Sequence, residues 1–220
     1  MPEVVGPLTQ LSRLYVICDA DVCRRAGWAL ADFAAACIDG GATLLQVRAK
    51  AISSGEMLEA TEVIVERAKS ANALVIVNDR ADVALAAGAG GIHVGQEDLT
   101  PSQVRTVVGD GMVVGFSTHT MEQLERAFEE PISYAAVGPI FGTDTKATGY
   151  EAVGLGHLQR AVTRAAELST PLPVVAIGGI TLERAPDVIA AGAASVAVIS
   201  DLLTTGNPTA RVRQFLAALR

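Results

Sequence analysis

Short apolar runs alternate along the chain with longer, alanine-rich segments in which apolar positions recur at helical spacing. The runs are rich in valine, isoleucine and leucine, residues that favour strands. They predict eight strands, at residues 14–18, 43–47, 74–77, 91–94, 112–115, 134–137, 174–177 and 195–199. The segments between them predict eight helices, at residues 27–39, 54–71, 80–88, 101–108, 120–129, 155–168, 181–191 and 207–219.

Strands that are apolar at nearly every position are buried on both faces, which indicates a parallel sheet covered by crossover helices. Eight strand–helix units in 220 residues match the count and size of a (β/α)8 TIM barrel, an α/β fold. A doubly wound open sheet is the alternative. No composition shift or low-complexity linker divides the chain, so we expect one domain over residues 1–220, with the barrel at about residues 13–219.

Charge and composition exclude several classes of partner. The chain has 17 lysine and arginine residues against 24 aspartate and glutamate residues, a net charge of −7, which argues against a nucleic acid. No apolar run reaches the length of about 18 residues that a membrane-spanning helix needs. The first residues carry no secretory signal, and Cys18, Cys23 and Cys37 fit no zinc or disulfide spacing. We therefore expect free thiols and a cytoplasmic protein.

In a barrel of this type the active site lies at the carboxyl ends of the strands. The second predicted strand ends in Gln46, Arg48 and Lys50, which fall on one side of an extended segment. An amide, a guanidinium and an ammonium group together are suited to a polar ring edge and a phosphate. The alternative is a solvated strand end without a ligand.

Two carboxylates follow neighbouring strands. Asp79 comes after the third predicted strand and Asp98 after the fourth, so we expect them within a few ångströms of each other at the barrel mouth. Mg²⁺ takes one or two carboxylates together with phosphate oxygens and water. The alternative is that each aspartate caps the helix that follows it.

The remaining strand ends add hydroxyl groups, a long loop and glycines. Ser117 and His119 follow the fifth strand, and a loop with Lys146 follows the sixth, where it could close over a phosphate or be an ordinary solvated loop. Gly179 follows the seventh strand and Ser200 the eighth, the usual position of a barrel phosphate site. Two anion sites and no credible nucleophile–base pair favour metal-assisted departure of pyrophosphate.

Six segments, in this order, resemble the thiamine-phosphate synthase family: QVRAK, VNDRADVALAAGAGGIHVGQEDL, GFSTHT, AAVGPIFGTDTK, VVAIGGI and VAVIS. The resemblance covers about residues 13–200. It implies a (β/α)8 barrel and a Mg²⁺-dependent transferase of thiamine biosynthesis. Such an enzyme joins hydroxymethylpyrimidine pyrophosphate to thiazole phosphate or its carboxylated form. The products are thiamine monophosphate and pyrophosphate, formed through a dissociative pyrimidine cation.

The resemblance also implies residue roles, with Arg48, Ser117 and Lys146 catalytic. Pyrimidine pyrophosphate would contact Gln46, Val47, Arg48, Ala49, Lys50, Asn78, Ser117 and Lys146. Thiazole phosphate would contact Thr143, Asp144, Thr145, Gly179, Ile199 and Ser200. Asp79 and Asp98 would hold one Mg²⁺. Gly142 departs from the family, which often has proline there.

Two alternatives remain open. A related group of barrels only isomerises the thiazole, using a histidine like His119, but such a reaction needs neither pyrophosphate nor metal. The second alternative is a barrel that binds phosphorylated ligands without turnover. The expected partners are small phosphorylated molecules, with a homodimer as an expectation that only the family supplies.

Overall fold

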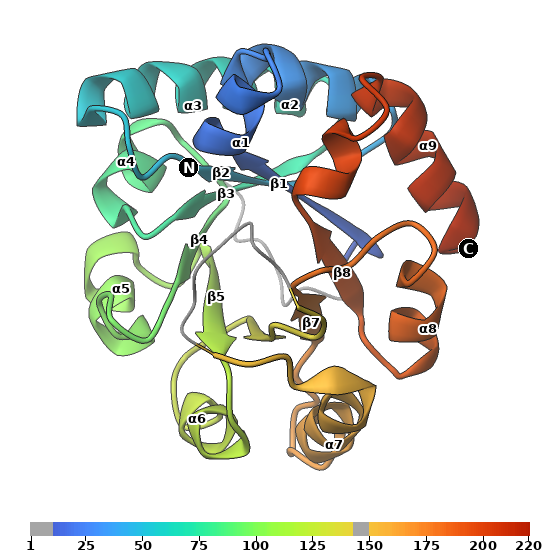
Figure 1. The fold of residues 1–220 in the computed structure, drawn as a ribbon. Coiled ribbons are helices and arrows are strands. Elements are labelled where there is room, and N and C mark those ends of the chain that lie inside the picture. Colours follow the sequence, from blue (N-terminus) through green and yellow to red (C-terminus); the bar gives the residue numbers. More distant parts are fainter. Residues whose placement is uncertain (1–10, 143–149) are drawn as a thin grey trace.

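The computed structural model describes residues 11–142 and 150–220, and its centre is a closed barrel of eight parallel strands (Figure 1). The strands are β1 (Leu14–Asp19), β2 (Leu44–Arg48), β3 (Leu74–Asn78), β4 (Gly91–Val94), β5 (Val113–Thr118), β6 (Tyr134–Val137), β7 (Val174–Ile177) and β8 (Ser195–Val198). Strand β1 pairs with β8 in the register Leu14↔Val196, which closes the sheet. The expected (β/α)8 barrel is confirmed, and the open sheet is excluded.

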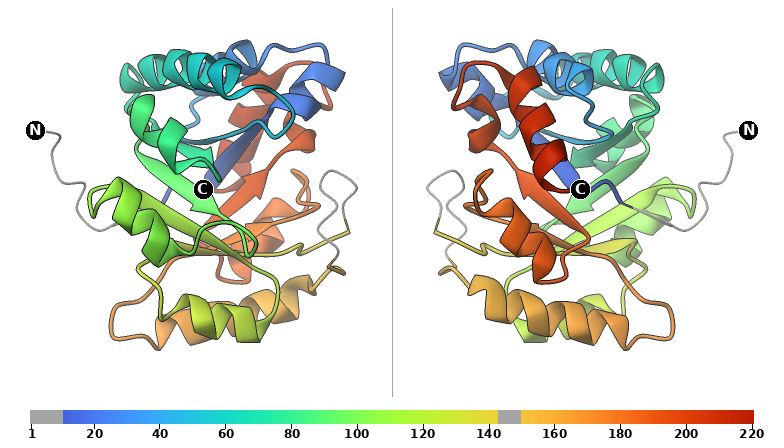
Figure 2. Two further views of the ribbon diagram at one scale, coloured as in Figure 1. Left: turned by 90° about the vertical axis from the view of Figure 1, so that its left-hand side faces the viewer. Right: turned by 90° about the vertical axis from the view of Figure 1, so that its right-hand side faces the viewer.

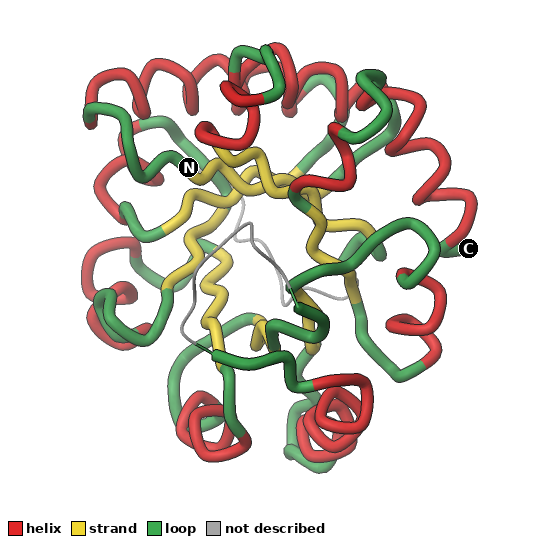
Figure 3. Tube along the Cα trace, in the orientation of Figure 1, coloured by secondary structure: helices red, strands yellow, loops and turns green. Residues whose placement is uncertain are grey.

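Helices surround the barrel on its outside (Figure 3). They are α1 (Ala20–Arg25), α2 (Leu30–Asp39), α3 (Ser54–Lys69), α4 (Ala81–Ala86), α5 (Pro101–Val108), α6 (Met121–Ala127), α7 (Gly154–Ala166), α8 (Ala185–Ala190), the 3-10 helix η1 (Ser200–Leu203) and α9 (Pro208–Ala218). Figure 2 shows α6 and α7 side by side, and the Glu125–Arg164 ion pair (2.7 Å) joins them.

The start of the chain differs from the expected pattern. A single first helix at residues 27–39 was expected, but α1 precedes it and α2 begins only at Leu30. Gly27 lies between them at φ +77°, a left-handed conformation that interrupts a helix. Two other helices have well-defined starts, because Ser53 and Thr100 each form a capping box with the residue three positions on.

Side chains of the strands alternate between two cores. One cluster consists of strand residues with Leu11 and fills the barrel interior; it includes Tyr15, Ile17 and Tyr134. The other lies between the strands and the helices and includes Val16, Cys18 and Val47. This alternation determines which residues at each strand end face the barrel mouth.

The three cysteines are free, as expected from their spacing, and all three are buried. Burial raises the pKa of Cys18 well above its ordinary value and that of Cys23 to about 12. Both are therefore protonated core residues. No helix within residues 11–142 and 150–220 is long and apolar enough to cross a membrane.

Candidate active site

Two adjoining cavities open at the carboxyl ends of the strands. The larger has a volume of about 540 Å³ and lies over β5 to β8, and the smaller has about 50 Å³ and lies at the centre of the barrel, where residues of all eight strands line it. Both are lined by Ser117, Ile177, Ala197 and Ile199, so they share one wall. The position agrees with the expectation for a TIM barrel.

The end of β2 presents three polar side chains to the smaller cavity. Gln46, Arg48 and Lys50 all line it, as the alternation along the strand predicts. Val47 and Ala49 point the other way and are buried in the core beneath the helices. A ligand contact from Val47 or Ala49 would therefore come from the backbone.

Arg48 has an ionic partner that the sequence did not reveal. Its guanidinium forms an ion pair with Asp19 at the end of β1, with side chains only 15% and 3% exposed respectively. Asp19 also caps α1, since its carboxylate accepts a hydrogen bond from the Val22 amide (3.0 Å). One buried carboxylate thus orients the arginine and starts a helix.

Asp79 and Asp98 come together at the mouth of β3 and β4, as predicted. Lys50 Nζ lies 3.1 Å from the Asp79 carboxylate, and Asp98 accepts a hydrogen bond from the Gly95 amide (2.8 Å). Burial, reinforced by the Asp98 carboxyl group, raises the pKa of Asp79 above its ordinary value. The charged form of Asp79 is therefore disfavoured at this position.

The capping alternative for these acids is wrong. Arg80 is the N-cap residue of α4 and Thr100 that of α5. Asp79 instead adopts a left-handed backbone with φ +63°, which is uncommon outside glycine. Its carboxylate is thereby available to the cavity rather than to the helix.

Ser117, His119 and Asn78 are further polar residues of the mouth. Ser117 lines both cavities and is hydrogen bonded to His93 (2.8 Å). The His119 ring donates from Nδ1 to the Gly138 carbonyl (2.5 Å) and stacks on Tyr150. Asn78 lines the smaller cavity.

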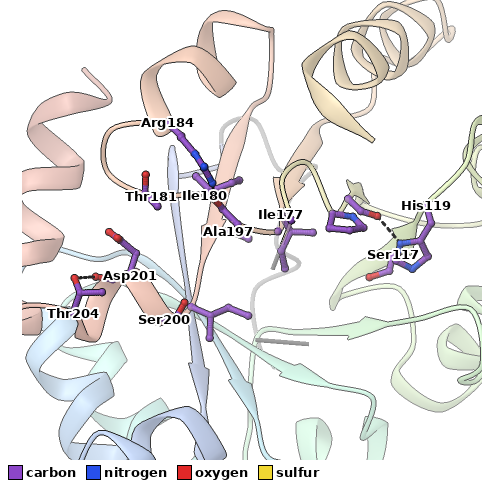
Figure 4. A pocket seen from close by; sticks show the side chains of 16 residues that line it. Ser117, His119, Ile177, Ile180, Thr181, Arg184, Ala197, Ser200, Asp201 and Thr204 are labelled. Carbon is purple, nitrogen blue, oxygen red and sulfur yellow. Dashed lines mark hydrogen bonds between the residues drawn. The ribbon is translucent and has the colours of Figure 1, made fainter. Parts of the chain in front are cut away.

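Glycines after β7 form one end of the larger cavity. Gly178 and Gly179 have φ values of +101° and +62°, which glycine adopts without strain. Ser200 begins η1 after β8, and Figure 4 shows it with Thr181 on one side of Ile177, opposite Ser117 and His119. Backbone amides and hydroxyl groups at this end suit a phosphate.

Arg184 is a further cavity residue that the sequence did not single out. It donates to the Gly179 carbonyl (2.8 Å), and its guanidinium lies 4.7 Å from the centre of the Phe141 ring. The sequence feature that could have indicated this role is its position, five residues after Gly179 and just before α8. It brings a positive charge to the glycine end.

The structure brings together most of the predicted residues. The smaller cavity is lined by Gln46, Arg48, Lys50, Asn78, Asp79, Asp98, Ser117 and Ile199, and the larger by Ser117, Gly179, Ile199 and Ser200. Four predicted residues lie outside the described part of the chain: Thr143, Asp144, Thr145 and Lys146.

Gly179→Ala is expected to lower the free energy of unfolding by about 2 kcal/mol, because a left-handed alanine costs about 1–2 kcal/mol and its Cβ also meets backbone. That Cβ would lie 2.6 Å from the Gly142 carbonyl oxygen. Denaturant unfolding measures the change. Gly156→Ala is the control, since nothing lies within 4 Å of its Cβ position. Equal stability of the two variants would contradict the close approach.

Comparisons with known proteins agree with this architecture. A family model described as thiamine monophosphate synthase matches residues 14–202. The thiamine-phosphate synthases of Koribacter versatilis and Mycolicibacterium gilvum are 46% and 42% identical, covering 96% and 100% of this chain and 97% and 92% of theirs. The solved thiamine phosphate pyrophosphorylase from Pyrococcus furiosus has a TM-score of 0.83 at 29% identity, covering 94% of this chain and 95% of its own. This chain therefore belongs to the thiamine monophosphate synthase family.

Proposed function

We propose that this chain is a thiamine-phosphate synthase that condenses hydroxymethylpyrimidine pyrophosphate with thiazole phosphate. The observation that carries the proposal is the pair of adjoining cavities, each with its own groups for an anion. Arg48 and Lys50 stand beside two carboxylates in one, and Gly179 and Ser200 lie at the end of the other. Two phosphorylated substrates, one in each cavity and both close to Ser117, would account for both groups of anion-binding residues.

In the smaller cavity, the proposed ligand is pyrimidine pyrophosphate. Arg48 and Lys50 donate to its phosphate oxygens, while Gln46 and Asn78 bind polar atoms of the ring. Because Asp19 holds the Arg48 guanidinium in place, little side-chain freedom remains to be lost when the substrate binds. Positioning of this kind favours a reactive geometry.

Asp79 and Asp98 fit the requirements of one Mg²⁺. They offer oxygen ligands close to each other, since both line the smaller cavity and the Asp98 carboxyl group is hydrogen bonded to that of Asp79. In residues 11–142 and 150–220, no group of three or more His, Cys, Asp and Glu side chains could hold a metal, so phosphate oxygens and water would complete the ligand set. The ion would supply positive charge to the departing pyrophosphate.

The reaction we propose is dissociative. The bond between the pyrimidine methylene carbon and the pyrophosphate oxygen breaks, and its electron pair leaves with the oxygen. Arg48, Ser117 and Lys146 stabilise the charge that develops there. The thiazole nitrogen then donates its lone pair to the methylene cation and forms the new C–N bond. With a carboxylated thiazole, the carboxyl group is lost as CO₂.

The thiazole phosphate would occupy the larger cavity. Its phosphate would bind at Gly179, Ile199 and Ser200, where Arg184 adds a positive charge. Thr143, Asp144 and Thr145 complete the proposed set from outside the described residues. The ring would then point toward Ser117, at the wall between the cavities.

The test is incubation of the protein with pyrimidine pyrophosphate, thiazole phosphate and Mg²⁺. We expect equimolar thiamine monophosphate and pyrophosphate, and loss of both products when EDTA removes the metal. Chromatography detects the first product and a coupled phosphatase assay the second. The two substrates without protein are the control.

Other outcomes of this assay would contradict the proposal. Interconversion of thiazole tautomers without coupling would assign the thiazole isomerase reaction, in which His119 is the candidate proton carrier. Binding of both substrates without product would assign a non-catalytic barrel. Product formation that survives EDTA would remove the metal from the proposal while leaving the transferase.

A further inference from the structure

A continuous network of hydrogen bonds crosses the barrel interior, and four of its residues, Tyr15, Gln46, His93 and Ser117, line the smaller cavity. Gln46 Nε2 donates to the Tyr15 hydroxyl (2.8 Å), which lies 3.0 Å from the Tyr134 hydroxyl. That hydroxyl is 2.9 Å from His93 Nδ1, and His93 Nε2 is 2.8 Å from Ser117 Oγ. The five residues come from β2, β1, β6, β4 and β5. The network thus connects two residues of the proposed pyrimidine site.

The network is shielded from solvent. Tyr15 and Tyr134 are 1% and 0% exposed, and His93 is buried beside them. Gly115 leaves the necessary space, because a Cβ at that position would overlap the Tyr134 ring and lie 2.6 Å from His93 Nδ1. Buried polar groups are costly without partners, so each of these groups is held to its neighbour.

The order of donors along the network follows from its first member. Burial raises the pKa of both tyrosines far above the ordinary value, so each hydroxyl keeps one hydrogen to donate. Because Tyr15 accepts from the Gln46 amide, we infer that its own hydrogen is donated to Tyr134.

Tyr134 in turn donates to His93 Nδ1, which must be unprotonated. A neutral imidazole then carries its hydrogen on Nε2, and this hydrogen is donated to Ser117 Oγ. Ser117 accepts this bond and has no other side-chain partner among residues 11–142 and 150–220. Its own hydroxyl hydrogen therefore remains for a ligand.

We propose that Tyr15, Tyr134 and His93 are positioning residues that keep Ser117 as a hydrogen-bond donor toward the departing pyrophosphate. Each member of the network donates its hydrogen to the next, from Gln46 to Ser117, and Ser117 donates into the cavities. A serine oriented in this way gives its hydrogen to the oxygen on which negative charge develops. This positioning role rests on the proposed function, whereas the order of donors and acceptors in the hydrogen-bond network does not.

The direction can be measured without substrate. In the ¹⁵N-labelled full chain, the ring nitrogen shifts of His93 report its tautomer, and His93→Gln assigns the signals among the three histidines. We expect hydrogen on Nε2 only. Hydrogen on Nδ1, or on both nitrogens, would reverse or break the order of donors and overturn the proposal.

The positioning role is tested by a double-mutant cycle. We expect Ser117→Ala to lower kcat about 100-fold, as for a donor to a developing oxyanion. Tyr134→Phe keeps the ring and should lower kcat about 10-fold, with an unchanged KM for thiazole phosphate. If Tyr134 acts through Ser117, adding Tyr134→Phe to Ser117→Ala lowers kcat no further. Multiplicative losses would overturn the proposal.

Two further variants separate positioning from folding. Tyr15→Phe should show the same non-additivity with Ser117→Ala, so the test does not depend on one variant being folded. Thr61→Val removes a buried hydroxyl in α3 that donates to the Met57 carbonyl (2.6 Å), and it should change neither kcat nor the His93 tautomer. If the wild-type protein does not join the two substrates, the proposed function fails. The His93 tautomer alone then tests the order of donors in the hydrogen-bond network.

Discussion

Asp98→Asn is expected to lower kcat about 1,000-fold, because in the proposed mechanism the removal of one of the two proposed metal carboxylates forfeits several kcal/mol of stabilisation of the leaving pyrophosphate. The fold should survive, since the asparagine carbonyl can still accept the hydrogen bond that Asp98 accepts from the Gly95 amide. Steady-state kinetics at saturating Mg²⁺ measures the effect. Thermal unfolding with and without Mg²⁺ measures ion binding independently of activity.

The matched control for this variant is Glu97→Gln. It makes the same change in charge one position earlier, on an exposed side chain that lines neither cavity. We expect wild-type kcat and a wild-type Mg²⁺-induced increase in Tm from Glu97→Gln, and no increase in Tm from Asp98→Asn. Near-normal turnover by Asp98→Asn would remove this residue from the site.

Asp19→Asn should lower the free energy of unfolding by about 3 kcal/mol, since it leaves the Arg48 guanidinium without its charge partner in a poorly solvated position. The two side chains are 3% and 15% exposed, so water can do little to replace the lost carboxylate. For a chain of this length, the loss corresponds to a fall in Tm of roughly 6–12 °C. Calorimetry measures it. Asparagine can still cap α1, so the charge is the main change.

Asp21→Asn provides the comparison for that result. Asp21 also pairs with an arginine, Arg24 (2.8 Å), but the Arg24 side chain is 72% exposed. Pairs of this kind contribute about 0–1 kcal/mol, so we expect a small change in Tm. Similar losses for the two variants would mean that the Asp19–Arg48 pair is no more important than a surface contact.

If Asp19 acts mainly by orienting Arg48, its loss should also affect catalysis. Arg48 lines the smaller cavity next to Lys50, and both are proposed ligands of the pyrophosphate. A buried carboxylate on a neighbouring strand restricts the guanidinium before any substrate arrives. If the proposed pyrophosphate contacts are correct, one ion pair links the stability of the fold to the affinity of the site for pyrophosphate.

The positions of the strands were predictable because local pattern and burial agree. Three of the eight, at residues 91–94, 134–137 and 174–177, have the predicted bounds in the structure. A barrel strand is apolar on both faces, so its limits appear directly in the sequence. The first helical region was less predictable, since α1 has only six residues and Gly27 separates it from α2.

The candidate site was predictable to the extent that it follows from strand order. The carboxyl ends of parallel strands meet at one rim, so polar residues that follow apolar runs must converge there. This reasoning placed Lys50, Asp79 and Asp98 together, and the structure has them together. It also placed Gly179 and Ser200 at one end of a cavity.

The sequence by itself thus determined the eight strands, most of the helices and the set of polar side chains that follow the strands, because these depend on spacing along the chain. Closure of the sheet through β1 and β8 became definite only in the tertiary structure. Only the tertiary structure decided which of those side chains have partners. Tyr15 and Tyr134 are 119 positions apart, yet they meet inside the barrel. Asp19 and Arg48 likewise pair across neighbouring strands. Such pairings depend on strand register and on the space that Gly115 leaves, and no local pattern records either.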